Sequence, residues 1–210
     1  MTIVGTKPHP IYLAGQWVES PDVLEVSNPA DGDHPAGLTY TATEAQYEAA
    51  VGAALDAFAV TRTLPAYERG RILREISAGI KGRREELGRT IALESGKPIR
   101  DALTEVDRAV LTFRLGAEEA ERMTGELIPL DLMASSRDRV GITRRFPIGP
   151  IAAISPFNFP LNLAAHKLSP AIASSNPIVL KPPSADPLTM LTVAEIIYGV
   201  GVPEGMVSIL

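Results

Sequence analysis

The stretch IAAISPFNFPLNLAAHKLSPAIASSNPIVLKPP, residues 151–183, decides the fold that we predict for this chain. The apolar run Ile151–Ser155, bounded by prolines, predicts a strand buried on both faces. A turn that places Pro160 at a first helical position predicts a helix ending near Asn176, and Ile178–Leu180 predicts a second strand. Strand, helix and strand form one βαβ unit, which is right-handed in nearly all proteins. We therefore predict an α/β fold built on a parallel sheet.

Two polar residues follow the predicted strands, Asn158 after the first and Lys181 after the second. In open α/β sheets, ligands bind where loops leave the carboxyl ends of the strands. An asparagine amide held between Pro156 and Pro160 is a suitable donor to an oxyanion, although a turn asparagine also commonly bonds its own backbone. A lysine in this place either keeps its charge in water or reaches a nucleotide. Both residues are candidates for a functional site.

Helices are predicted on both sides of the central unit. Upstream, Thr43–Gln46 has the pattern of a capping box, and four helices follow in which apolar residues at helical spacing indicate packing surfaces. Their apolar stripes are Tyr47, Val51, Leu55 and Phe58; Ile72, Leu73, Ile76 and Ile80; Leu87, Ile91 and Leu93; and Leu103, Val106, Val110 and Phe113. Downstream, Asp186 is predicted to cap a helix that starts at Pro187. Met206–Leu210 begins a third strand, which predicts a doubly wound sheet.

Composition excludes several classes of protein and site. The chain has 210 residues, 45% of them hydrophobic, which is enough for a globular core in one or two domains. The net charge of −5 gives no electrostatic case for a nucleic-acid partner. There is no cysteine, and the three histidines lack metal-ligand spacing, so no metal site is predicted. Neither a signal peptide nor a membrane-length apolar run is present, which favours a cytoplasmic protein.

Several motifs in order resemble the aldehyde dehydrogenase superfamily over essentially the whole chain. They are Ile11–Val18, Asn28–Ala30, Ala66–Arg69, Glu94–Pro98, Phe146–Pro150, Pro156–Pro160, Lys181–Pro182 and Gly201–Gly205. The resemblance implies an enzyme that oxidises an aldehyde to a carboxylic acid with NAD or NADP, through a thiohemiacetal on a cysteine. Because this chain has no cysteine and stops in mid-architecture, we expect an N-terminal portion without the catalytic domain, inactive alone. The alternative is a truncated, non-catalytic module for nucleotide binding or self-association.

The resemblance also implies roles for individual residues. Asn158 would stabilise the oxyanion of the thiohemiacetal, and Lys181 would contact the adenosine ribose. The cofactor groove would be lined by the backbone of Ile154, Ser155, Pro156 and Phe157. Ser184 stands where many NAD-preferring relatives have an acidic residue. Because a serine does not repel a 2′-phosphate, we predict that NADP is accepted.

The residues after Asn158 are predicted to approach the substrate. Phe159, Leu163 and His166 fall at i, i+4 and i+7, and by resemblance this face lines the substrate tunnel. The wording of the segment resembles relatives that oxidise small hydroxylated or phosphorylated aldehydes. For His166, a packing histidine is the alternative.

The arginine-rich segment 135–147 is predicted to separate two parts of the chain. Its charges fit an edge strand that avoids stray pairing. By resemblance, it joins a small bridging sheet that binds a neighbouring subunit, so we expect the full-length form to be a homo-oligomer, a dimer or a tetramer. The predicted organisation is a first part of the cofactor domain at 1–134, the bridging segment at 135–147, and the start of the Rossmann-type unit at 148–210.

Overall fold

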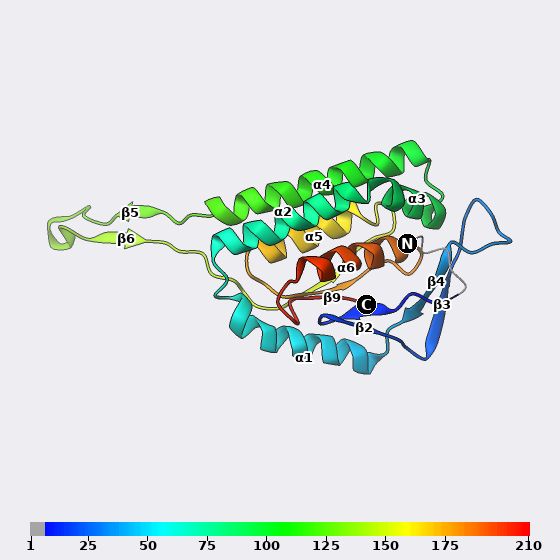
Figure 1. The fold of residues 1–210 in the computed structure, drawn as a ribbon. Coiled ribbons are helices and arrows are strands. Elements are labelled where there is room, and N and C mark those ends of the chain that lie inside the picture. The colour runs from blue at the N-terminus through cyan, green and yellow to red at the C-terminus, as the bar shows by residue number, and fades with distance from the viewer. Residues whose placement is uncertain (1–6) are drawn as a thin grey trace.

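A computed structural model describes residues 7–210, and its centre is a five-stranded sheet of order β2-β1-β9-β8-β7 (Figure 1). The strands are β1 (Ile11–Leu13), β2 (Gln16–Val18), β7 (Ile151–Ile154), β8 (Ile178–Lys181) and β9 (Val207–Ile209). Strands β7, β8 and β9 are parallel, which confirms the predicted α/β class and βαβ unit. Strand β1 pairs antiparallel with β9, placing Tyr12 opposite Ile209, and forms a hairpin with β2.

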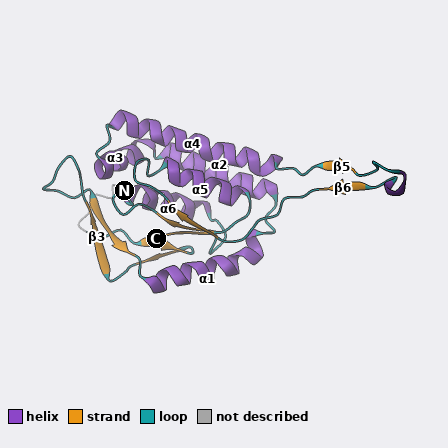
Figure 2. Cartoon of the chain, turned by 180° about the vertical axis from the view of Figure 1, so that it is seen from behind, coloured by secondary structure: helices purple, strands orange, loops and turns teal. Residues whose placement is uncertain are grey.

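Helices cover the sheet in layers, as the views from both sides show (Figures 1 and 2). The helices are α1 (Glu44–Thr61), α2 (Ala66–Gly82), α3 (Arg84–Ser95), α4 (Ile99–Arg122), α5 (Asn162–Ala173) and α6 (Leu188–Val200). The crossover helices α5 and α6 lie on one face of the sheet, and α1 lies on the other. Helices α2, α3 and α4 pack on the outside of α5 and α6. None of the described helices has the length and apolarity needed to cross a membrane.

The outer helices follow the predicted periodicity closely. The α2 stripe at residues 72, 73, 76 and 80 is fully buried, as are Leu87 and Ile91 of α3 and Phe113 of α4. Helix α3 ends at Gly96, whose φ of 68° is the left-handed conformation typical of a glycine cap. These stripes meet α5 and α6 in one continuous apolar core. The predicted packing surfaces are therefore correct for α2, α3 and α4.

Helix α1 differs from its predicted packing. The capping box is confirmed, since Thr43 and Gln46 exchange side-chain and backbone hydrogen bonds. The predicted stripe is wrong, however, because Val51 and Leu55 are 47% and 60% exposed. The buried stripe consists of small residues, Ala50, Ala54, Ala57 and Thr61. These let α1 approach the loop before β9 so closely that a Cβ at Gly205 would lie 2.6 Å from the carbonyl oxygen of Ala53.

Strand β7 is not buried on both faces, contrary to the prediction. Ala153 and Ser155 are buried beneath the crossover helices, whereas Ile154 on the opposite face is 71% exposed. The reason is tertiary: α1 packs against Val179 of β8 and against Leu210, and does not extend over β7. In the described chain, β7 is therefore an edge strand with one open face.

Two antiparallel strand pairs lie outside the central sheet. Strands β3 (Asp22–Val26) and β4 (Gly37–Thr41) form one pair, and β5 (Leu127–Pro129) and β6 (Val140–Ile142) form the other. The second pair belongs to an arm, residues 126–143, which extends away from the rest of the molecule (Figure 1). Strand β6 falls in the predicted bridging segment, but β5 was not predicted. Gly125 precedes the arm, at a position where a Cβ would clash with the carbonyl oxygen of Thr143.

Candidate functional site

The carboxyl ends of β7 and β8 bring the two predicted loops together. The strands pair in register, Ile154 opposite Lys181, and the Ser155 N–H donates to the Lys181 carbonyl at 3.1 Å. The loop that carries Asn158 therefore leaves the sheet beside the loop that carries Ser184. This edge is where α/β sheets bind ligands.

Asn158 lies exposed in the loop after β7, with its carboxamide free. Its backbone carbonyl accepts a hydrogen bond from Lys97 Nζ at 3.0 Å. Within residues 7–210 its side chain makes no hydrogen bond, so it does not bond its own turn, which was the alternative considered. The carboxamide N–H is thus available to an external acceptor.

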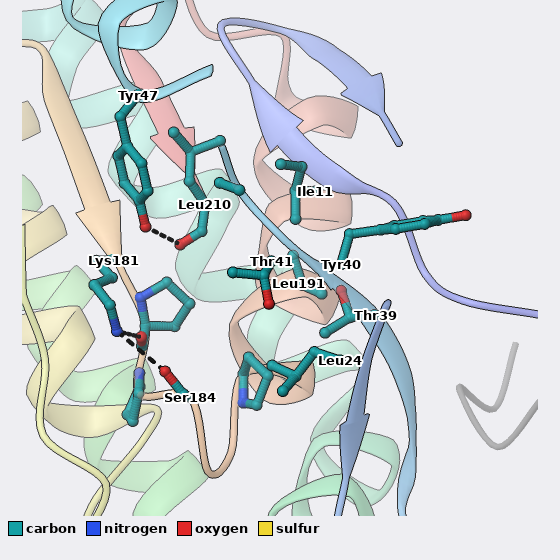
Figure 3. Close-up of a pocket in the computed structure, with 14 residues that line it drawn as sticks. Ile11, Leu24, Thr39, Tyr40, Thr41, Tyr47, Lys181, Ser184, Leu191 and Leu210 are labelled. Atoms are coloured by element: carbon teal, nitrogen blue, oxygen red, sulfur yellow. Dashed lines mark hydrogen bonds between the residues drawn. The ribbon is translucent and has the colours of Figure 1, made fainter. Parts of the chain in front are cut away.

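Lys181 and Ser184 meet directly. Lys181 Nζ donates to Ser184 Oγ at 3.3 Å and to the Pro182 carbonyl at 3.1 Å, and Figure 3 shows the two side chains pointing toward each other. They line a pocket bounded by β3, β4 and α1, where the Tyr47 hydroxyl donates to the Leu210 carbonyl at 3.4 Å. Ser184 is exposed, and no aspartate or glutamate side chain lines this pocket.

The residues that were predicted to line the cofactor groove lie at the end of β7 and in the loop that follows it. Ile154 and Phe157 are strongly exposed there, and Pro156 is exposed between them. Ser155 is buried, and its hydroxyl has no hydrogen-bond partner in the described part of the chain. This leaves an uncovered apolar strip whose backbone borders Asn158.

The three predicted substrate residues have different environments. Phe159 precedes α5, and its ring lies under Lys97 Nζ at 4.3 Å and the Arg108 guanidinium at 5.6 Å. The Leu163 N–H donates to the Phe159 carbonyl at 3.0 Å, so the helical spacing extends back to Phe159 although α5 begins at Asn162. Leu163 is half-buried, and His166 is exposed. Their role toward a substrate stays a prediction.

Two buried glutamates that sequence reasoning missed hold the crossover helices in place. Glu105 Oε1 on α4 accepts the N–H groups of Leu161 and Asn162 at 3.0 and 3.1 Å, at the start of α5. Glu94 on α3 accepts the N–H groups of Leu188 and Thr189 at 2.7 and 3.0 Å, at the start of α6. Each glutamate lies on the apolar stripe of its helix. A carboxylate at a position where the helical repeat predicts burial is the signal in the sequence that could have revealed these two glutamates.

Asp186 does not cap α6, contrary to the prediction. Glu94 occupies the amide groups that it would accept, and Asp186 Oδ1 is buried with no hydrogen-bond partner among residues 7–210. Burial and, to a smaller extent, the Glu105 carboxylate raise the pKa of Asp186 to about 7, and the positive charge of Lys97 opposes this shift. Burial likewise raises the pKa of Glu94 to about 8, and the hydrogen bonds from Thr189 oppose this shift. The edge of the sheet thus contains a buried acidic cluster, which consists of Glu94, Glu105 and Asp186.

Comparisons with known proteins give one consistent result. The family model described as the aldehyde dehydrogenase family matches residues 17–210. The chain is 36% identical to a 3-sulfolactaldehyde dehydrogenase of Priestia megaterium, covering 100% of this chain and 43% of that protein. A crystal structure of aldehyde dehydrogenase 21 from Physcomitrella patens with the product succinate is 42% identical, with a TM-score of 0.92 over 99% of this chain and 43% of that one.

A second solved structure carries a cofactor. The NADP-dependent glyceraldehyde-3-phosphate dehydrogenase from Bacillus halodurans, complexed with NADP, is 31% identical, with a TM-score of 0.92 over 98% of this chain and 44% of that one. The chain therefore spans less than half the length of the relatives that it matches.

Proposed function

The chain belongs to the aldehyde dehydrogenase family, and we propose that it supplies the oxyanion asparagine and part of the dinucleotide site to an enzyme that oxidises an aldehyde to a carboxylic acid. The observation that carries this proposal is the register of β7 and β8. It sets the free carboxamide of Asn158 and the Lys181–Ser184 pair at one edge of the sheet.

Asn158 suits the developing negative charge of a tetrahedral adduct. When a thiolate attacks the aldehyde carbon, the carbonyl oxygen of the aldehyde becomes an oxyanion. A preorganised amide donor that stabilises this oxyanion typically raises the reaction rate by about 10²–10³. The chain contains no cysteine, so the thiolate would come from outside these residues. We expect the chain alone to show no turnover.

The edge of the sheet also suits a nicotinamide dinucleotide, which would accept the hydride when bound. The open strip beside β7 offers an apolar surface through Ile154 and Phe157. The Lys181 ammonium supplies a positive charge 3.3 Å from Ser184 Oγ. Because no aspartate or glutamate side chain lines this pocket, no acidic side chain there repels a 2′-phosphate, and we propose that NADP is accepted.

The arm supports a proposal of self-association. Leu127, Leu132, Met133 and Ile142 are all mostly exposed on it. An exposed apolar surface on a two-stranded ribbon is typical of a protein–protein contact. We propose that the arm packs against a second copy, in a dimer or a tetramer.

The test is calorimetric titration of the chain with NADP and with NAD. Lys181→Met should weaken NADP binding about tenfold, because one charge contact with phosphate or ribose is lost. Ser184→Asp should weaken NADP more than NAD, because its carboxylate repels the 2′-phosphate. Lys81→Met, at an exposed lysine at the end of α2, is the matched control and should leave both affinities unchanged.

Three results would contradict these proposals. Absence of saturable binding of either dinucleotide would remove the assigned site. An unchanged NADP-to-NAD ratio in Ser184→Asp would remove the role of Ser184. Aldehyde-dependent reduction of NADP by the chain alone would require a nucleophile other than cysteine, whereas dinucleotide binding without turnover is the expected outcome.

A further inference from the structure

The buried carboxylate of Glu105 joins two elements that meet at the candidate site. Its Oε1 accepts the first N–H groups of α5, and its Oε2 lies 2.5 Å from Lys97 Nζ. The Glu105 side chain is fully buried, and that of Lys97 is 16% exposed. An ion pair so shielded from water holds its geometry more firmly than a surface pair.

Lys97 is itself fixed in place. It lies between Gly96, which ends α3 in a left-handed conformation, and Pro98, which immediately precedes α4. Its ammonium donates to Glu105 and to the Asn158 carbonyl, at 2.5 and 3.0 Å, and lies over the ring of Phe159 at 4.3 Å. The ammonium therefore connects the α3–α4 junction, the start of α5 and the loop after β7.

The hydrogen bond from Lys97 is the main restraint on the position of Asn158. Asn158 is exposed, and in the described chain the bond from Lys97 is the only hydrogen bond that it makes. Pro156 and Pro160 lie two residues before and after Asn158. Neither has a backbone N–H, so neither can donate a hydrogen bond that would hold the loop in place. A hydrogen-bond donor is effective toward an oxyanion only when its position is set before the charge develops.

We propose that Lys97, held by Glu105, is the positioning residue that fixes the backbone of Asn158 and so directs its free carboxamide toward the oxyanion. The proposal rests on the function proposed above, in which Asn158 is the oxyanion donor. Lys97 touches no reacting atom in this arrangement and acts only through Asn158.

The experiment measures backbone ¹⁵N relaxation in the 210-residue chain, in which Asn158 and Asn162 report on two sides of the network. In the native chain both order parameters should lie near 0.85, and in Lys97→Met that of Asn158 alone should fall below about 0.6. Lys97→Arg, which keeps a cationic donor, should restore most of the Asn158 value. Lys81→Met is the control and should change neither signal.

Two outcomes would overturn the proposal. The first is an unchanged Asn158 in Lys97→Met. The second is an equal loss at Asn162, which would show that Lys97 merely stabilises the start of α5. If Lys97→Met does not fold because Glu105 loses its counter-charge, the double variant Lys97→Met with Glu105→Gln removes both charges, keeps an acceptor for α5, and should give the same loss at Asn158.

This measurement needs neither cofactor nor aldehyde. Failure to bind NADP would contradict the proposed function and leave the relaxation result standing. A rigid Asn158 in Lys97→Met beside normal NADP binding would contradict only the positioning role.

Discussion

In the body of the molecule Phe113 of α4 is completely buried, whereas in the arm Leu132 and Ile142 are 82% and 78% exposed. Both regions are rich in apolar side chains, and both have regular backbone hydrogen bonding. The body buries its apolar side chains between helices α2, α3 and α4 and the crossover helices, while the arm has two strands and a short 3₁₀ helix, Ala134–Ser136, and no layer in the described chain covers them. A two-stranded ribbon is at best marginally stable in water alone. The comparison teaches that the stability of the chain resides in the body, and it supports the proposal that the arm contacts a second copy.

The largest effect that sharpens this comparison is expected from a cavity in the body. Phe113→Ala should lower the free energy of unfolding by about 3–5 kcal/mol, the usual cost of emptying a packed aromatic site. Leu132→Ala in the arm is the matched variant and should change it by less than about 0.5 kcal/mol. Urea denaturation measures both, and equal losses would contradict the division into body and arm.

The next effect concerns the polar part of the body. Glu105→Ala should cost about 2–4 kcal/mol, because it leaves Lys97 without a counter-charge and two amide groups of α5 without an acceptor. Glu118→Ala, on the exposed side of the same helix, should cost less than about 0.5 kcal/mol. A neutral result for Glu105→Ala in the same denaturation experiment would show that the network contributes nothing to stability.

The acidic cluster gives the body a dependence on pH. Folding raises the pKa of Asp186 to about 7 and that of Glu94 to about 8, so the folded chain holds these protons more tightly than the unfolded chain does. Their contribution to stability is complete below the unfolded values near pH 4 and is lost as the pH rises through about 7 to 8. The free energy of unfolding should therefore fall between pH 5 and pH 8.

Asp186→Asn isolates one of these groups. It should stabilise the chain by about 1–3 kcal/mol more at pH 8 than at pH 5, because the neutral amide has no proton to lose. Asp56→Asn, at an exposed aspartate of α1, should show no such difference. Denaturation at the two pH values is the measurement, and parallel curves for Asp186→Asn and the native chain would exclude this role.

The smallest effect on folding is expected in the arm. Leu127→Ser combined with Ile142→Ser removes a cross-strand pair whose side chains are mostly exposed. At concentrations where the chain is monomeric, it should change the free energy of unfolding by less than about 0.5 kcal/mol. Sedimentation should show self-association weakened at least about tenfold, whereas Val60→Ser in the body should leave it unchanged. Unaltered association in the double variant would remove the arm from the contact.

The sequence predicted the elements whose burial follows from local periodicity. The stripe at Ile72, Ile76 and Ile80 was predictable because a 3.6-residue repeat places these residues on one face of a helix. The buried face of α1 was not predictable, because its alanines are less apolar than Val51 and Leu55. The alanines are buried because only small side chains allow α1 to lie so close to the loop before β9. The exposure of Ile154 was not predictable either, since it depends on where α1 ends in space.

The candidate site shows the same division. Asn158 and Lys181 could be found because they follow apolar strands, and a parallel sheet gathers its carboxyl ends at one edge. The anchoring of Asn158 by Lys97 could not be found, because it joins residues 61 positions apart through a turn that no local pattern describes. Asp186 was misassigned because an acceptor on a distant helix, Glu94, competes for the same amide groups.

The pairing of β1 with β9 has a consequence for how the chain acquires its structure. Tyr12 is opposite Ile209, so β1 cannot pair with β9 until the intervening residues have been synthesised. At roughly 5–20 residues per second, that wait on a ribosome is about 10–40 s. Helices α2, α3 and α4 have contacts that are local in sequence and are free to form much earlier, because such contacts require little loop closure. The pairing of the β1–β2 hairpin with β9 is therefore a late step, and the aromatic residues Tyr12 and Trp17 of the hairpin would report it.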